Sequence, residues 1–216
     1  DLDFMVFPTG TFYKRIGDSS STWSPKSKNF LISFLKHNLK WTIMSPIWKK
    51  SALKMLNGFD EEYSRMQDVE LHTRALLNPN FRFKVLPNHP IDNFYRIDLN
   101  RTLRNTEEQL KNFRDGVFMY ISKIFPTLKE KKHKKALKVS LFSLMNSINY
   151  SKARSEISTK IYNRFEEEIK SFMFDNDEIF NKKKIFFLST YNKFYAFGFW
   201  RIKGYNFIMK VIFSAL

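Results

Sequence analysis

The stretch that decides the fold class is residues 41–74, WTIMSPIWKKSALKMLNGFDEEYSRMQDVELHTR. Residues 41–48 are rich in β-formers and predict a strand that its internal proline breaks. Residues 49–56 predict a short helix, and Gly58 allows the left-handed backbone that ends it. Residues 67–77 predict the next helix. A strand followed closely by helices is typical of an α/β protein.

Strand and helix signals continue on both sides of this stretch. Residues 4–7, FMVF, predict a buried strand that ends in a turn at Pro8-Thr9-Gly10. Residues 30–40 predict a helix from the spacing of their apolar side chains. Residues 81–85 alternate aromatic or apolar with basic side chains, which predicts a half-buried strand, and residues 94–97 predict another. The first half of the chain is therefore expected to be a mixed sheet with helices.

The strand signals then stop, and the rest of the chain predicts helices. Thr106-Glu107-Glu108-Gln109 opens the first with a Thr cap and a Gln at the capping-box position. Apolar residues at helical spacing predict a second helix, with Leu137, Leu141, Leu144 and Ile148 on one face, and a third over residues 155–174. We therefore predict an α/β domain over residues 1–105, part of a larger sheet, followed by an all-helical domain over residues 106–216.

The composition is that of a globular protein with 43% hydrophobic and 27% charged residues. The 24 Phe suggest that some rings face a groove or a partner. A net charge of +16 suits nucleic acid, anionic lipid or phosphorylated ligands, and equally a solvated lysine-rich surface. The lack of cysteine excludes disulfides, thiolate metal sites and a Cys nucleophile, and fits a cytoplasmic protein.

Residues 185–216 form an unusual segment in which aromatic rings alternate with basic side chains. This combination is typical of a helix that lies on an anionic membrane surface. A helix packed on its own domain and a partner-binding helix are the alternatives. Peripheral contact with the inner face of the plasma membrane is thus one of three expectations.

Asp68 is the strongest candidate for a catalytic residue, because it stands at the first turn of the helix over residues 67–77. Free backbone amides and the helix dipole stabilise an anionic carboxylate there. A fixed, ionised carboxylate at the mouth of an α/β sheet is what a general base needs. By spacing alone, a helix cap is the commoner role of such an Asp.

The order of these motifs resembles the family-2 glycosyltransferases of GT-A fold. That family commonly carries a Gly-Gly-Phe-Asp-Glu turn, then a Glu-Asp pair opening a helix whose next turn holds Leu and Arg. Residues 58–61, Asp68, Leu71 and Arg74 match this pattern, whereas Asn57 replaces the first Gly and Gln67 replaces the Glu. The resemblance covers residues 1 to about 100.

The resemblance implies that Asp68 is the catalytic base, which deprotonates an acceptor hydroxyl for inverting attack on the anomeric carbon of a sugar. Trp41, Trp48 and His72 could line the acceptor site, since aromatic faces stack on sugar rings, although at least one Trp is expected in the core. Gln67, beside the base, is also assigned to substrate binding.

Phe94-Tyr95-Arg96 resembles the later Tyr-Arg segment of the family, which lies near its site. We therefore assign Arg96 to substrate binding. Asp98 stands where relatives often place a His, and we assign it as a possible metal ligand. Surface ion pairs are the alternative role of both residues.

The resemblance also implies a donor half with an Asp-x-Asp that holds Mg²⁺ or Mn²⁺ on a nucleoside diphosphate. Asp1-Leu2-Asp3 spells that pattern, but it adjoins the FMVF strand that follows the metal motif in relatives and lies too close to Asp68. We therefore expect the metal motif upstream and this chain alone to be inactive. The parent would transfer a sugar from a nucleotide sugar to a glycan or lipid-linked acceptor, in cell-surface polysaccharide synthesis.

Two other classes of protein fit parts of the sequence. A nucleic-acid-binding protein fits the charge, but no helix-turn-helix, finger or RNA-recognition signature is present, and Lys131 to Lys138 is more typical of a solvated helix face. A non-catalytic module, whose tail binds a membrane or a partner, also fits. Gly-rich phosphate loops, metal-ligand His spacing and a GxSxG motif are all absent from the sequence.

Overall fold

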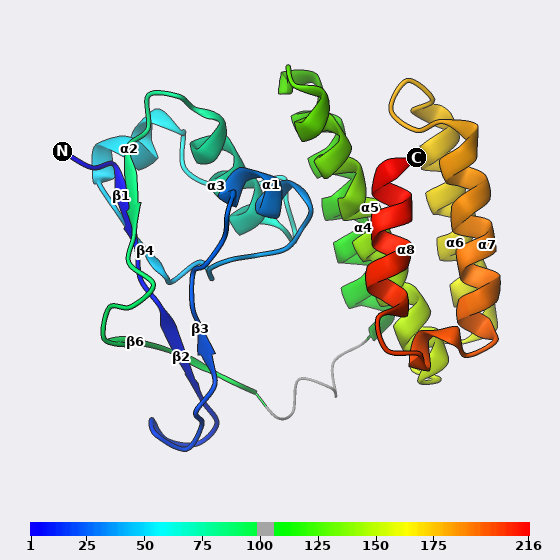
Figure 1. Cartoon of the computed structure of the whole chain (residues 1–216), viewed down its shortest axis with the longest axis horizontal. Coiled ribbons are helices and arrows are strands. Elements are labelled where there is room, and N and C mark those ends of the chain that lie inside the picture. The colour runs from blue at the N-terminus through cyan, green and yellow to red at the C-terminus, as the bar shows by residue number, and fades with distance from the viewer. Residues whose placement is uncertain (99–105) are drawn as a thin grey trace. The chain divides into compact units, whose positions relative to one another are not determined.

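The computed structural model describes residues 1–98 and 106–216, and the chain divides into two compact units (Figure 1). One consists of Asp1–Phe34 with Asn38–Arg104, and the other of Leu35–His37 with Asn105–Leu216. The first unit combines two small sheets with helices, and the second is built of helices. The architecture is therefore mixed α/β followed by a helical unit.

The first sheet of the α/β unit has the strand order β4-β1-β5. The central strand β1 (Phe4–Val6) runs antiparallel to β4 (Pro46–Trp48) and parallel to β5 (Phe83–Val85). The ring of Phe4 stacks on the aromatic rings opposite it on β4 and β5, at centroid distances of 4.3 and 4.9 Å. Because these rings meet directly across the strands, they fix the register of the sheet.

The second sheet has the order β3-β2-β6, in which β2 (Thr9–Phe12) is antiparallel to β3 (Thr22–Trp23) and parallel to β6 (Asn93–Arg96). The predicted turn at Pro8-Thr9-Gly10 is wrong, because Thr9 and Gly10 pair with β6. Local turn propensity does not report a partner strand so far away in the sequence.

The predicted strand over residues 41–48 is also corrected, since only its last three residues, β4, are a strand. The preceding residues form a turn closed by the amide of Ser45, which donates to the carbonyl of Thr42 at 3.1 Å. Pro46 begins an edge strand, a position that tolerates proline, and so does not interrupt one.

A buried hydroxyl network joins this turn to the strands. The Thr9 hydroxyl is fully buried and donates to the side-chain oxygen of Asn93 at 2.6 Å. It also lies 2.8 Å from the hydroxyl of Ser45. Asn93 donates in turn to the carbonyl of Pro8 at 3.0 Å. These bonds satisfy polar groups that would otherwise be buried without partners.

Three helices complete the α/β unit: α1 (Phe30–Leu35), α2 (Lys50–Met55) and α3 (Gln67–Leu77). The predicted bounds of α3 are confirmed. α1 is shorter than predicted, and His37 beyond it has a left-handed backbone with φ of 52°. Gly58 follows α2 with φ of 65°, which confirms the predicted left-handed stop.

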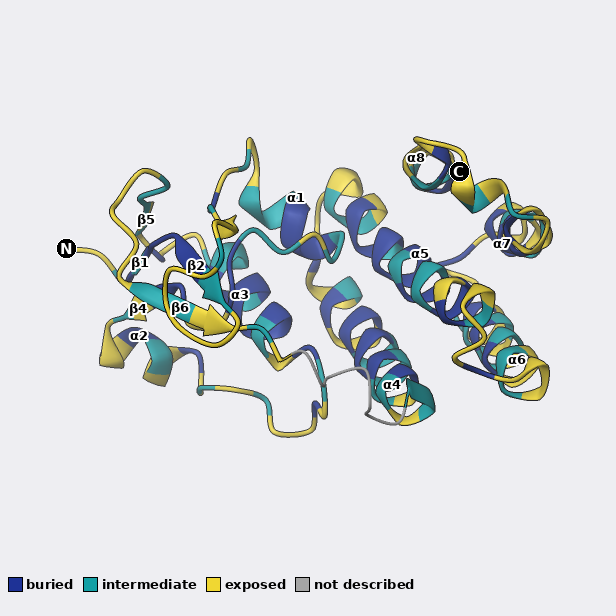
Figure 2. Cartoon of the chain, turned by 90° about the horizontal axis from the view of Figure 1, so that it is seen from below, coloured by how far each residue is buried: buried dark blue, intermediate teal, exposed yellow. Residues whose placement is uncertain are grey.

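The helical unit contains long helices whose buried faces point toward one another (Figure 2). The predicted stripe Leu137, Leu141, Leu144 and Ile148 is confirmed as fully buried. The third helix begins later than predicted, where the Ser158 hydroxyl accepts the amide of Ile161 at 3.2 Å. The elements are α4 (Thr106–Ile124), η2 (Phe125–Thr127), α5 (Lys131–Ala153), α6 (Thr159–Asp175), α7 (Lys182–Ala196), η3 (Phe199–Arg201) and α8 (Tyr205–Ala215).

Within the described residues, no helix combines the length and the apolar character needed to cross a bilayer.

Gly10 is expected to be intolerant of a side chain. A Cβ there would lie 2.7 Å from Cδ1 of Phe94, so Gly10→Ala should lower the free energy of unfolding by about 1–3 kcal/mol. Phe94→Leu should relieve part of this cost, and a double-mutant cycle in urea measures the coupling. Additive effects of the two substitutions would contradict the steric explanation.

Candidate functional site

Arg74 fixes the turn between α2 and α3. Its guanidinium on α3 donates to the carbonyl of Gly58 at 2.8 Å and to the carbonyl of Leu56. Glu70, one helical turn earlier and buried, pairs with the same guanidinium, with Nη2 and Oε2 2.8 Å apart. Carbonyls at the end of a helix need such donors, so this contact, which we call the Arg74 clamp, ties the end of α2 to α3.

The residues between Gly58 and α3 form a second local anchor. The Asp60 carboxylate accepts the amide of Glu62 at 3.1 Å, and the Asp60 carbonyl accepts the amide of Tyr63 at 3.3 Å. The Tyr63 ring is buried, which holds the loop against the unit. Met66 then takes a left-handed backbone, with φ of 77°, directly before α3. This geometry sets the direction in which α3 begins.

Asp68 is the second residue of α3 and is half-buried. Its Oδ1 accepts the amide of Val69 at 2.9 Å. Met66, not Asp68, is the N-cap residue of α3. Burial raises the pKa of the Asp68 carboxyl, although the Val69 amide and the charge of Arg65 act in the opposite direction. A carboxylate with raised proton affinity, held at a helix start, has the properties of a general base.

One turn along α3, His72 lies in a cluster of aromatic rings. Only 1% of its surface is exposed, and no described residue hydrogen-bonds either ring nitrogen. Burial lowers the pKa of His72 to about 3, so the ring is neutral at pH 7. The ring centroids of Phe34, Trp41 and Trp48 lie 5.3, 5.6 and 5.8 Å from that of His72.

The aromatic residues that the sequence assigned to an acceptor site differ in their exposure to solvent. Trp41, like His72, is almost fully buried, so both pack in the core and neither presents a face to an acceptor. Trp48 stacks on His72 and stays partly exposed. Gln67 is exposed beside Asp68 on the first turn of α3. Trp48, Gln67 and Asp68 are thus the assigned residues of this region that solvent reaches.

Arg96 and Asp98 belong to the other sheet of the unit. Arg96 is the last residue of β6, and its Nε donates to the carbonyl of Tyr13 at 3.2 Å. Asp98 follows β6, and both side chains are exposed. Within residues 1–98 and 106–216, no group of three His, Asp or Glu side chains is placed to hold a metal ion. The assignment of Asp98 as a metal ligand stays a prediction, because the residues that follow it lie outside the described ranges.

The acidic residues at the start of the chain make contacts that hold the first sheet. The Asp1 carboxylate pairs with the Lys49 ammonium at 3.0 Å. The Asp3 carboxylate accepts the amide of Arg82 at 2.8 Å. Both carboxylates therefore link β1 to the segments next to its neighbouring strands.

A pocket of about 420 Å³ in the helical unit was not predicted from the sequence. Asn149 on α5 donates to Asn192 on α7 at 3.0 Å and accepts the hydroxyl of Tyr162 at 2.9 Å. Trp200 and Arg201 of η3 also line this pocket. The Asn residues lie far apart in the sequence and share no motif, so no local pattern could have indicated the site.

Because comparison with known proteins finds no match, a functional proposal rests on the geometry and the sequence. No protein-family model, no curated protein and no solved structure matches this chain. The resemblance to family-2 glycosyltransferases accordingly stays a prediction, carried by the residues from Gly58 to Arg74.

His72 should make the α/β unit sensitive to acid. Because its pKa is lowered on folding, the unfolded state binds the proton first, and stability should fall by up to about 1.4 kcal/mol per pH unit from pH 6.5 toward about 3. His72→Phe should flatten this dependence, as measured by urea unfolding followed through Trp fluorescence. An equally steep fall in the variant would assign the acid sensitivity to other groups.

The ionised Asp68 should lower the stability of the fold at neutral pH, because its pKa is raised on folding. The cost is absent below the unfolded pKa of 3.8 and grows as pH rises through the folded value. Asp68→Asn should therefore raise the free energy of unfolding at pH 7, and the gain should vanish in acid. Asp177→Asn, in an exposed loop, is the control. A loss of stability at pH 7 would instead identify Asp68 as a stabilising helix-start residue.

Proposed function

We propose that this chain is the acceptor-side part of a glycosyltransferase similar to family 2, with a partial GT-A-like sheet and Asp68 as the catalytic base. The observation that carries the proposal is the half-buried Asp68 carboxylate, with its raised pKa, at the first turn of α3. Arg74, which matches the family motif, supports it by fixing the turn that leads to α3.

In the proposed reaction, Asp68 accepts the proton of an acceptor hydroxyl. The hydroxyl oxygen then forms a bond to the anomeric carbon of the donor sugar from the side opposite the leaving group. The bond from that carbon to the nucleoside diphosphate breaks, and the diphosphate leaves with the electron pair. Desolvation of Asp68 favours this step because it increases the proton affinity of the carboxylate.

The acceptor side of the site would be formed by partly exposed residues next to Asp68. Trp48, a partly exposed ring that stacks on Phe4 and His72, is the residue proposed to contact the apolar face of a sugar ring. Gln67 offers an amide that can donate to and accept from sugar hydroxyls. The acceptor class proposed is a glycan or a lipid-linked glycan. Arg96 stays a weaker proposal, because it lies on the second sheet and contacts the Tyr13 backbone.

The donor side is proposed to lie in another part of the parent polypeptide. Within the described residues, no group of three or more His, Asp or Glu side chains is placed to hold a metal ion. We propose that the nucleotide-sugar pocket and an Asp-x-Asp motif for Mg²⁺ or Mn²⁺ belong to the parent polypeptide outside this chain. On this proposal the chain contributes acceptor binding and the base.

The test measures sugar transfer by the parent polypeptide, over a panel of nucleotide sugars and glycan acceptors with Mn²⁺. Asp68→Asn should lower kcat by at least about 100-fold and leave the acceptor KM nearly unchanged, since it removes only the proton acceptor. Trp48→Ala should mainly raise the acceptor KM. Asp177→Asn, on an exposed loop of the helical unit, should match wild type.

Binding of the same acceptors to the 216-residue chain provides a second readout that needs no donor. Calorimetry should detect the acceptor with wild type and Asp68→Asn alike, and more weakly with Trp48→Ala. Equal transfer rates for wild type and Asp68→Asn would remove the base assignment. The glycosyltransferase proposal would be overturned if, across the panel, the parent transferred no sugar and the chain bound no acceptor.

A further inference from the structure

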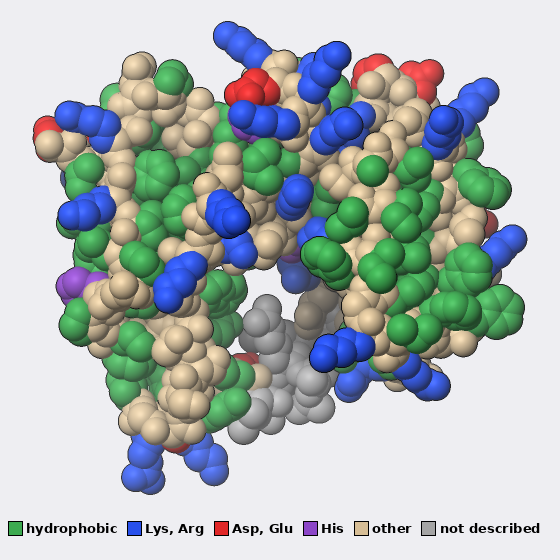
Figure 3. All heavy atoms as spheres, in the orientation of Figure 1, with side chains coloured by type: hydrophobic (Ala, Val, Ile, Leu, Met, Phe, Trp, Pro, Cys, Tyr) green, Lys and Arg blue, Asp and Glu red, His purple; other side chains and the backbone are tan. Residues whose placement is uncertain are grey.

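Helix α8 is apolar on the side that faces away from its own unit. Phe207, Ile208, Val211 and Ile212 are all exposed, with Phe207 at 72%. The opposite side is buried through Phe213. Figure 3 shows hydrophobic side chains gathered over α8, with Lys and Arg side chains around them. A helix with apolar side chains on both sides is normally covered on both. The outer side of α8 is exposed instead, so it lacks a covering surface.

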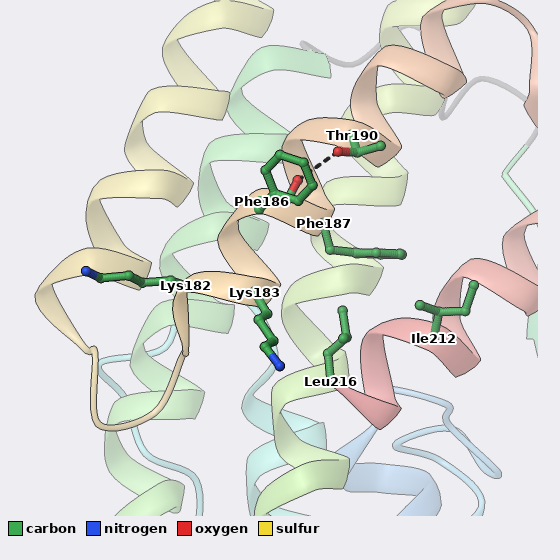
Figure 4. Close-up of a pocket in the computed structure, with 7 residues that line it drawn as sticks. All are labelled: Lys182, Lys183, Phe186, Phe187, Thr190, Ile212 and Leu216. Atoms are coloured by element: carbon green, nitrogen blue, oxygen red, sulfur yellow. Dashed lines mark hydrogen bonds between the residues drawn. The ribbon is translucent and has the colours of Figure 1, made fainter.

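Helix α7 extends the same apolar surface. Phe186 is 75% exposed and Phe197 is 82% exposed, at opposite ends of α7. Between α7 and α8 lies a groove of about 520 Å³, lined by rings of α7 and by Ile212 of α8, with Lys182 and Lys183 at one end (Figure 4). We call this surface the α7–α8 face, defined by Phe186, Phe197, Phe207, Ile208, Val211 and Ile212.

The α7–α8 face is held in place by polar contacts beneath it. The buried Lys184 ammonium, at the start of α7, donates to the carbonyl of Phe213 near the end of α8. Asn181 donates to the carbonyl of Leu216 at 3.0 Å. The Tyr191 hydroxyl bonds to the side chain of Asn206 at 3.2 Å. The first two contacts satisfy carbonyls at the end of α8, and the three together fix α8 beside α7.

The helices that form this face carry basic and no acidic side chains. Residues 181–216 contain no Asp or Glu, and neither does α5, on which α7 and α8 pack. Several acidic residues of α4 and α6 pair with cations of those helices, as in Arg164–Glu107 and Arg114–Glu168. By contrast, no acidic side chain in the described parts of the chain pairs with Lys182, Lys183, Lys193 or Lys203.

We propose that the α7–α8 face docks on the surface of an anionic lipid bilayer. The exposed rings would enter the boundary between headgroups and acyl chains, while the unpaired lysines contact lipid phosphates. α8 has 11 residues and spans ~16 Å, against ~30 Å for a hydrocarbon core, so it lies in the plane of the membrane.

A second copy of the chain suits the face less well than an anionic membrane, because two such faces would bring like charges together. The absence of acidic side chains from α7 and α8 leaves nothing on either helix to offset that repulsion. This docking proposal does not depend on the glycosyltransferase proposal.

The experiment measures co-sedimentation of the full chain with vesicles of phosphatidylcholine, alone or mixed with phosphatidylglycerol. Wild type should bind the anionic vesicles at least about tenfold more tightly, and binding should weaken as NaCl is raised. Phe186→Glu combined with Phe207→Glu should reduce the binding at least about tenfold. Phe174→Glu is the matched control, because Phe174 is 59% exposed on α6, outside the face.

Lys182→Gln combined with Lys183→Gln provides a second variant that leaves the apolar packing unchanged, and it should also weaken anionic binding. Circular dichroism verifies the fold of each variant. Equal binding of wild type to both vesicle types, or wild-type binding by the folded Phe and Lys variants, would overturn the proposal. The proposal would also be overturned if the chain failed to bind anionic vesicles and instead self-associated in sedimentation, with the Phe variant abolishing that self-association. A second copy would then cover the face.

Discussion

The α/β unit depends on one half-buried ionic contact, the Arg74 clamp. The turn after α2 has left-handed residues and leaves carbonyls of Leu56 and Gly58 without helical partners. Arg74 supplies donors to both, and the buried Glu70 keeps its guanidinium aligned. A guanidinium suits this task because its planar fork can serve two carbonyls and a carboxylate at once. The position of α3, and with it that of Asp68, follows from this contact.

Two titratable groups on α3 respond to the same physical effect with opposite shifts. Burial disfavours the charged form of each, so the pKa of Asp68 rises and that of His72 falls. The consequence differs because His72 is enclosed by rings, whereas Asp68 keeps contact with solvent. One helix therefore combines a neutral packing residue with a carboxylate of increased proton affinity. Such costs to folding are common at functional sites, where stability is exchanged for reactivity.

The high aromatic content has different uses in the two units. In the α/β unit, rings such as those of Phe4 and Trp41 stack within the core. In the helical unit, many rings are also buried, yet Phe186, Phe197 and Phe207 remain largely exposed beside basic side chains. The segregation of acidic residues to other helices makes this surface chemically distinct. Phe content alone does not distinguish these uses, because core packing and surface docking employ the same side chain.

The sequence by itself determined the features that depend on neighbours in the chain: the bounds of α3, the stop at Gly58, the buried stripe of α5 and the place of Asp68 in a first helical turn. Periodicity and turn chemistry act over a few residues, so they can be read locally. Only the tertiary structure decided that Thr9 lies in a strand and that His72 is enclosed. Pairing, burial and desolvation arise from partners distant in the sequence, and local patterns carry no information about which partners meet.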